Sequence, residues 1–149
     1  MDIKARLIEY EGSKEYQTKL GYFRNGKYHV YKDTVNVATI GFGHKVLPGE
    51  NFTNGITELE ASTLLDKDIS IARSQLVKLN LSHLPSDWND LLVIMLFQLG
   101  LTGTMRFKKM IAALQVNNYP EAIKQMRDSL WYKQTPNRVN QMINQLTNK

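Results

Sequence analysis

The spacing of apolar residues predicts that the N-terminal part of the chain changes from a helix to extended segments. Apolar residues recur at near-helical intervals over 2–11, and the next residue, Gly12, is suited to leaving a helix. From about 16 to 46, aromatic and β-branched residues are interrupted by turns, and Asn25-Gly26 is a strong hairpin signal. The pattern therefore predicts a short first helix followed by a small β-rich lobe.

The rest of the chain has a helical pattern. A capping box begins at Thr57, and apolar residues then recur every three or four positions, which predicts one long helix over 58–80. Residues 91–97 are apolar on every side, as expected of a helix buried at the centre of a helical lobe. The last predicted helix has Thr135 as its cap and Pro136 at its first position. The later helices are predicted at about 106–116, 120–131 and 136–147.

This order of elements predicts an α+β fold. A small β-rich N-terminal lobe, about 12–57, is joined by the long helix to a mainly helical C-terminal lobe, about 81–149, to which helix 2–11 also belongs. Because neither an internal repeat nor a low-complexity linker separates the lobes, we expect residues 1–149 to form a single domain. A cleft between the lobes is the expected ligand site.

Composition limits the chemistry. The absence of cysteine excludes disulfides, thiolate metal sites and a cysteine nucleophile, and the three histidines are scattered, so we expect neither a metal nor a cofactor. No apolar run approaches the roughly 18 residues of a membrane span, and the first residues lack the apolar stretch of a signal peptide. We therefore expect no membrane insertion, and synthesis in the cytoplasm.

The formal charge of +5 would attract polyanions such as nucleic acid or an anionic cell wall, or it serves solubility alone. Aromatic residues over 22–31 alternate with Arg24 and Lys27, an arrangement that can form a stacking platform for nucleic acid. No recognised nucleic-acid motif accompanies them, so we expect no nucleic-acid partner.

Three residues suggest a reaction: Glu11, Asp33 and Thr39. A single acidic residue is most often a solvated surface carboxylate. Together, however, the three match the requirement of glycoside hydrolysis for one carboxylic acid that protonates the leaving oxygen and a second group that directs water.

Five separated segments carry a family resemblance, and their order along the chain makes it specific. They are Glu11-Gly12, YKDT at 31–34, TIGFGH at 39–44, MLFQLGLTG at 95–103 and SLWYKQTPNR at 129–138. In this order they resemble the T-even phage lysozymes of glycoside hydrolase family 24. The resemblance implies a lysozyme-like fold and an inverting endo-muramidase that cuts the β-1,4 bond between N-acetylmuramic acid and N-acetylglucosamine of bacterial peptidoglycan.

The resemblance also implies roles for individual residues. Glu11 matches the general acid, and Asp33 and Thr39 match the pair that holds the attacking water. Gln98 matches a cleft residue whose amide could bind the N-acetyl groups of the sugar, although a helix-end role is the alternative. Tyr31 matches another cleft-lining, substrate-binding position, or it is a packing residue of a strand.

Three further residues match structural positions near the site. His44 and Asp68 match an ion pair that joins the β-rich lobe to the long helix, a role in stability rather than catalysis. Arg138 matches an arginine placed near the amino-terminal acid, where its charge would help to fix the position of Glu11; a plain surface arginine is the competing interpretation.

The chain departs from the family between the acid and the water-holding residues. Glu11 and Asp33 are 22 positions apart (33 − 11), more than the family usually has. The surplus falls around 16–29, and we interpret it as an extended hairpin at the cleft edge. It could contact substrate or a partner, or be a tolerated surface insertion, which costs little loop-closure entropy.

Two alternatives concern the biological context. A catalytically inactive peptidoglycan-binding domain of a phage structural protein would not need Glu11, Asp33 and Thr39 in register. The sequence also leaves open a short, monomeric endolysin or a lysozyme domain of a larger phage tail protein. In either case we expect synthesis in the cytoplasm of the host bacterium and action on the cell wall in the periplasm.

Overall fold

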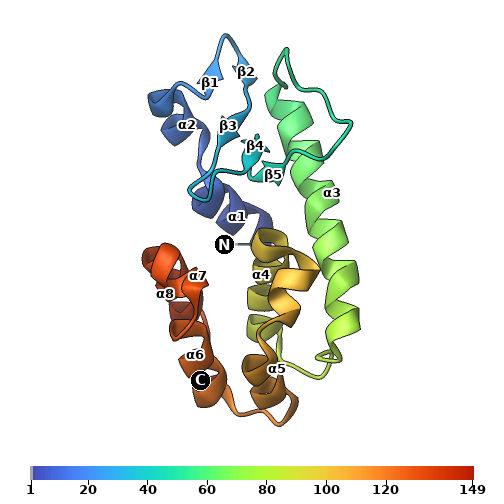
Figure 1. Cartoon of the computed structure of the whole chain (residues 1–149), viewed down its shortest axis with the longest axis vertical. Helices are drawn as coiled ribbons and strands as arrows, with labels where there is room; N and C mark the ends of the chain where they lie inside the picture. Colours follow the sequence, from blue (N-terminus) through green and yellow to red (C-terminus); the bar gives the residue numbers. More distant parts are fainter. Residues whose placement is uncertain (1) are drawn as a thin grey trace. The chain divides into compact units, whose positions relative to one another are not determined.

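A computed structural model describes residues 2–149, and its contacts separate two units, one up to Ser70 and one from Ile71 to Lys149 (Figure 1). Short strands occur only in the first unit, and the second is helical. This arrangement confirms the predicted α+β fold class, with strands in the N-terminal part and a mainly helical C-terminal part. That residues 1–149 form one domain stays a prediction.

Helix α1 (Ile3–Glu11) confirms the predicted first helix. Asp2 caps it, because its side chain accepts a hydrogen bond from the backbone N–H of Ala5 at 2.8 Å. Leu7 is fully buried on its inner face. The helix ends at Gly12, whose φ of 121° favours glycine. The conformation of Gly12 therefore determines where the chain leaves the helix after Glu11.

A second helix, α2 (Lys14–Leu20), occupies part of the segment that the sequence analysis interpreted as hairpin. Ser13 caps α2 through a hydrogen bond from the backbone N–H of Tyr16, and Gly21 ends it in the left-handed conformation. The interpretation of 16–29 as one extended hairpin is therefore wrong for its first part. The helix was missed because its seven residues carry no repeated apolar stripe and depend on their two caps instead.

The predicted hairpin is present in the second part of that segment. Strands β1 (Phe23–Arg24) and β2 (Lys27–Tyr28) pair antiparallel across Asn25-Gly26, and both turn residues have positive φ. Tyr28 is 0% exposed, and its backbone pairs with Ile56. Its ring packs against those of Phe23 and Phe42. The inserted residues therefore contribute to the core of the first unit.

A three-stranded antiparallel sheet follows, in the order β3 (Tyr31–Lys32), β4 (Ala38–Ile40), β5 (His44–Lys45). Its register places Tyr31 opposite Thr39, and Ile40 opposite His44. These pairings bring the YKDT and TIGFGH segments onto neighbouring strands.

Helix α3 (Glu58–Leu76) begins at the predicted capping box. The backbone N–H of Thr57 donates to Glu60 Oε1 at 3.0 Å, and that of Glu60 donates to Thr57 Oγ1 at 3.2 Å. A 3₁₀ turn (Val77–Leu79) follows, and Asn80 ends it in the left-handed conformation. The apolar stripe of α3 is buried, as its period predicts, and comprises Ala61, Leu65, Ile69, Ala72 and Leu76.

Helix α4 (Ser86–Met105) is the central helix of the second unit. Its residues 91–96 are almost completely buried, which confirms the core position predicted for the apolar run. Burying each such side chain stabilises the unit by about 1.5–3 kcal/mol. Gly100, with φ 74° and ψ 174°, interrupts the helix.

Among residues 2–149 no single helix is long and apolar enough to cross a membrane. Helix α4 and the helix that follows it, Lys108–Gln115, meet the test of length and composition together, but their axes are bent by 101° relative to each other.

The remaining helices are α5 (Lys108–Gln115), α6 (Tyr119–Arg127), α7 (Leu130–Gln134) and α8 (Pro136–Asn144). The prediction of one helix over 120–131 is wrong, because Ser129 starts α7 by capping it. Thr135 precedes Pro136 as predicted, but it does not cap α8. Its hydroxyl donates to the carbonyl oxygen of Trp131 at 3.0 Å instead.

Candidate active site

Glu11 is the last residue of α1, and its side chain is half-buried. Its carboxyl group lies against Gly43: a Cβ added at Gly43 would stand 3.0 Å from both Cδ and Oε2 of Glu11. The contact with Gly43 thus fixes the position of this carboxyl group.

Asp33 lies in the tight turn between β3 and β4. Its Oδ1 accepts hydrogen bonds from the backbone N–H groups of Val35 and Val37, at 3.0 and 2.8 Å. Its own backbone N–H donates to the carbonyl oxygen of Val37 at 3.0 Å. The turn therefore fixes the orientation of this carboxylate without using its second oxygen.

Thr39 lies on β4 and is 3% exposed. Its hydroxyl donates to the carbonyl oxygen of Val37 at 2.9 Å. The hydroxyl proton of Thr39 is therefore used in this hydrogen bond, and the lone pairs of Oγ1 can still accept one. Because Asp33 and Thr39 both bind Val37, one residue of the β3–β4 connection holds the two side chains together.

Tyr31 begins β3, directly across from Thr39. Its ring stacks on that of Tyr22, with centroids 4.3 Å apart and planes 5° from parallel. Tyr22 comes from the inserted segment, so the insertion meets the sheet beside the candidate site. The aromatic composition of residues 22–31 was the only sequence signal for this contact.

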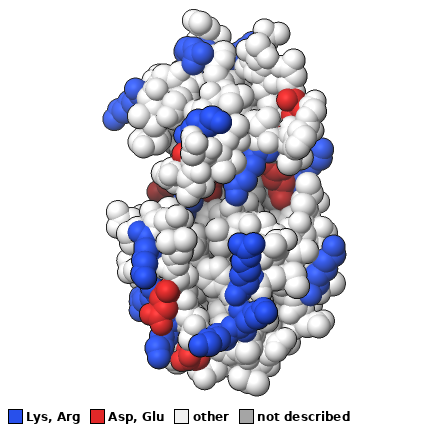
Figure 2. All heavy atoms as spheres, viewed as in Figure 1, with Lys and Arg blue, Asp and Glu red and all other residues white. Residues whose placement is uncertain are grey.

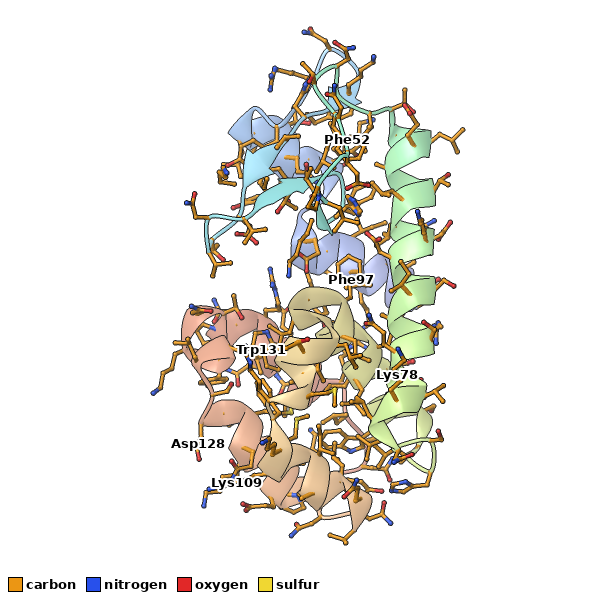
Figure 3. The ribbon with its side chains drawn as sticks, turned by 45° about the vertical axis from the view of Figure 1, so that its right-hand side comes forward. Phe52, Lys78, Phe97, Lys109, Asp128 and Trp131 are labelled. Carbon is orange, nitrogen blue, oxygen red and sulfur yellow. The ribbon has the colours of Figure 1, made fainter. Side chains whose placement is uncertain are left out.

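His44 is tied to two carboxylates. Its Nδ1 lies 2.7 Å from Asp68 Oδ2 on α3, and its Nε2 lies 2.9 Å from Glu50 Oε1. Burial alone would lower the pKa of His44, but hydrogen bonds and the negative charges of Asp68 and Glu50 outweigh it and raise the pKa. Phe52, labelled in Figure 3, lies between β5 and α3, and its ring packs edge-on against the imidazole of His44. Glu50 was not among the residues predicted from sequence; it lies six residues after His44 in an irregular loop.

The pKa of Glu50 is shifted in the opposite direction to that of His44. Burial would raise the pKa of its carboxyl group, but hydrogen bonds from the backbone of Leu47 and from His44 lower the pKa overall. The contacts of His44, Glu50 and Asp68 support a structural role for this cluster rather than a role in proton transfer. It ties β5 to α3 within the first unit.

Gln98 and Arg138 belong to the second unit. Gln98 is 8% exposed and stands two positions before the interruption of α4 at Gly100. Arg138 is half-buried in the first turn of α8. Their roles toward substrate and toward Glu11 stay predictions.

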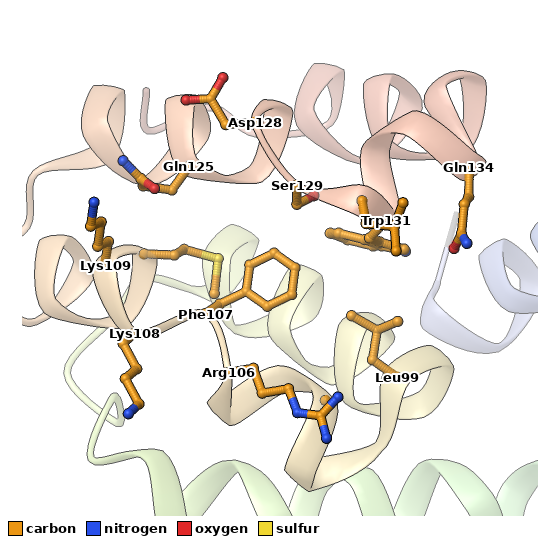
Figure 4. Close-up of a pocket in the computed structure, with 13 residues that line it drawn as sticks. Leu99, Arg106, Phe107, Lys108, Lys109, Gln125, Asp128, Ser129, Trp131 and Gln134 are labelled. Carbon is orange, nitrogen blue, oxygen red and sulfur yellow. The ribbon is translucent and has the colours of Figure 1, made fainter.

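A pocket of about 560 Å³ lies within the second unit (Figure 4). Leu99, Phe107 and Trp131 form an apolar surface, and the rings of Phe107 and Trp131 meet edge-on at 6.0 Å. Arg106 and Lys109 stand at its border. None of the residues nominated from sequence lines this pocket.

Charge on the molecular surface agrees with the basic composition. Figure 2 shows Lys and Arg side chains spread over the visible face of both units, with few acidic ones among them. Within residues 2–149, no group of three or more His, Asp or Glu side chains is placed to hold a metal ion.

Comparisons with known proteins agree with the resemblance. The family model for phage lysozyme matches residues 22–148, so Glu11 lies outside the matched range. Two relatives from Dictyostelium discoideum, "Probable T4-type lysozyme 1" and "Probable T4-type lysozyme 2", are 29% and 30% identical; each alignment covers 83% of this chain and 88% of the relative. The "Pre-baseplate central spike protein Gp5" of Enterobacteria phage T4 is 29% identical over 76% of this chain and 24% of its own length. The chain therefore belongs to the phage lysozyme family and is an enzyme of the lysozyme type.

Proposed function

We propose that this enzyme is an inverting, endo-acting muramidase that hydrolyses the β-1,4 bond between N-acetylmuramic acid and N-acetylglucosamine in phage-mediated degradation of the cell wall. The observation that carries the proposal is the arrangement in the first unit. Glu11 lies against Gly43 of the TIGFGH segment, and Asp33 and Thr39 are both held by Val37 of the preceding strand connection.

Glu11 acts as the general acid in this proposal. It protonates the glycosidic oxygen as the bond to the anomeric carbon breaks, so that the leaving sugar departs as an alcohol. Its half-buried position and its contact with Gly43 support this role, because they hold the carboxyl group in one place.

Asp33 and Thr39 hold the water that attacks the opposite face of the sugar. The second oxygen of Asp33 takes a proton from this water, and Thr39 Oγ1 accepts its other hydrogen. An inverting enzyme needs room for the water, so we expect the carboxyl groups of Glu11 and Asp33 to be about 6.5–9.5 Å apart, against about 5–5.5 Å in a retaining pair.

The remaining nominated residues have supporting roles. Gln98 binds an N-acetyl group of the substrate through its amide, and the ring of Tyr31 contacts a sugar. Burial of Gln98 and the stacking of Tyr31 on Tyr22 support these assignments, because both side chains are ordered before substrate binds.

Two settings fit this activity. The likeness to the T4 central spike protein supports a domain of a larger phage tail protein, which the particle would carry to the wall. A free monomeric enzyme would be made in the host cytoplasm and would need a pore to reach the peptidoglycan in the periplasm. The substrate is peptidoglycan in both settings.

Substitution of the proposed acid tests the mechanism. Glu11→Gln should fold normally but lose roughly 10²–10⁴-fold in rate on soluble peptidoglycan fragments, because an amide cannot donate the proton. Glu9→Gln, an exposed position on the same helix, is the matched control and should stay active. Equal rates for the two variants would refute the role of Glu11.

The stereochemical outcome tests inversion separately. NMR of the first-formed product should show the α-anomer of the new reducing end, since the substrate bond is β. Initial release of the β-anomer would show a retaining mechanism. Binding to walls without any hydrolysis by the folded protein would favour the inactive-binder alternative.

A further inference from the structure

The inserted helix α2 places one polar side chain in the interior of the first unit. Gln17 is 1% exposed, yet it lies in a helix whose other residues are exposed. Its Nε2 donates two hydrogen bonds, to the carbonyl oxygen of Gly12 at 2.9 Å and to that of Gly41 at 2.8 Å. Both partners are acceptors, so the two protons of the amide nitrogen are both used.

These two carbonyl groups flank the proposed catalytic residues. Gly12 directly follows Glu11, and Gly41 lies between Thr39 and Gly43, against which the carboxyl group of Glu11 packs. Both glycines are buried and have positive φ, 121° and 64°. Gln17 supplies the bridge between the two segments, one leaving α1 and the other leaving β4.

Other contacts fix the insertion that carries Gln17. Ser13 caps the start of α2, and the backbone N–H of Tyr22 donates to the carbonyl oxygen of Gln17 at 2.9 Å. The ring of Tyr22 then stacks on Tyr31 of β3. The amide is therefore held from both ends of its helix.

From this geometry we infer that Gln17 is a positioning residue, which holds the segment of Glu11 in register with the Thr39–Gly43 segment. The inference rests on the proposed role of Glu11. It assigns the inserted segment a part in building the active site, in place of a tolerated surface insertion. A displacement of about 1 Å at such a site can cost 10²-fold in rate, so a small loosening would be measurable.

Gln17→Met is the test substitution, because methionine keeps the length of the side chain and cannot donate a hydrogen bond. On soluble peptidoglycan fragments we expect kcat to fall about 10–100-fold while KM changes less than about threefold. Thr18→Val, which removes one exposed hydrogen bond from the same helix, and Ile3→Val, which trims the buried core of α1, are the controls. Neither should lower kcat to a similar extent.

A double-substitution cycle separates positioning from stability. In the Glu11→Gln background there is no proton donor to position, so adding Gln17→Met should lower the residual rate little further. If Gln17 acted only on stability, Gln17→Met would lower the rate of the Glu11→Gln protein by the same factor as it lowers that of the wild type. A kcat for Gln17→Met equal to that of Ile3→Val would also overturn the inference while leaving the role of Glu11 intact.

The unmodified protein supplies a readout that needs no activity. The side-chain NH₂ protons of Gln17 should exchange with solvent far more slowly than those of the exposed Gln115. Equal exchange rates would show that the bridge is absent and would overturn the inference. If instead the wild type and Glu11→Gln cleave equally fast, the proposed role of Glu11 fails, and the inference that depends on it fails with it.

Discussion

Gly43 leaves space for Glu11: a Cβ at position 43 would lie 2.7 Å from Cγ of that glutamate. No side chain larger than hydrogen fits there without moving the glutamate, because this distance is shorter than any normal contact. Gly43 also has a φ of 87°, which side chains rarely adopt. The second glycine of the TIGFGH segment therefore serves the acid directly.

Gly43→Ala should accordingly lower kcat strongly, while its loss of stability should match that of a control glycine with similar backbone conformation. The new methyl group must displace the carboxyl group of Glu11, and we expect a loss of about 10²-fold in kcat. Gly49→Ala is the matched control, because Gly49 has a φ of 89° and nothing within 4 Å of an added Cβ. Both variants should lose about 1–2 kcal/mol of stability from backbone strain. Equal activities of the two variants would contradict the contact with Glu11.

His44→Asn should lower the free energy of unfolding by about 1–3 kcal/mol and leave most activity. The raised pKa of His44 means that its stabilisation is complete below the unfolded value near 6.5 and is lost as the pH rises through the higher folded value. Urea unfolding at pH 5.5 and pH 9 should therefore show the larger loss at the lower pH.

The control for that substitution is His83→Asn, whose imidazole contacts the carbonyl oxygen of Leu114 rather than a carboxylate. A loss of the same size at both pH values would contradict the ion-pair interpretation. An inactive His44→Asn protein with unchanged stability would show that the imidazole acts in catalysis.

Tyr28→Phe should leave the first unit equally stable or more stable, by about 1 kcal/mol. The hydroxyl of Tyr28 is buried without a hydrogen-bond partner among the described residues. Burial, with the charges of Glu58 and Glu15, raises its pKa to about 12. Above pH 10 the unfolded state loses this proton first, so wild-type stability falls with rising pH, and the variant should escape that part of the decline.

Tyr132→Phe provides the contrast for Tyr28→Phe. The hydroxyl of Tyr132 accepts a hydrogen bond from Asn140 Nδ2 at 3.2 Å, so its removal should destabilise by about 0.5–1.5 kcal/mol. Thermal unfolding of both variants at neutral pH measures the difference in sign. A clear loss of stability in Tyr28→Phe would mean that its hydroxyl is hydrogen-bonded in solution.

Asp87→Asn should destabilise the second unit by about 1–3 kcal/mol at neutral pH. Burial would raise the pKa of Asp87, but hydrogen bonds from the backbone of Asn148, Thr147 and Trp88 lower it. The stabilisation is present above the unfolded value near 3.8 and is lost as the pH falls through the folded value. Unfolding curves at pH 7 and pH 3 check this, with Asp90→Asn on the same helix as control. A deficit that persists unchanged at pH 3 would contradict it.

The sequence by itself determined the elements whose signals are local. The apolar period of α3, its capping box at Thr57 and Glu60, and the Asn25-Gly26 turn each act within a few residues, and the structure has all three. The five ordered segments identified the family, because they are spread along nearly the whole chain. The same matches nominated Glu11, Asp33 and Thr39, although the family model itself begins after Glu11.

Only the tertiary structure decided which residues support that site. Gln17 donates a hydrogen bond to the carbonyl oxygen of Gly41, 24 positions away, and His44 contacts Glu50, which was not predicted, in addition to the predicted Asp68. A short helix such as α2 leaves no apolar period by which to recognise it, and its single buried polar residue is indistinguishable in sequence from its exposed neighbours. Such contacts depend on how separate segments pack together, and the free energy that selects them appears only when the chain has folded.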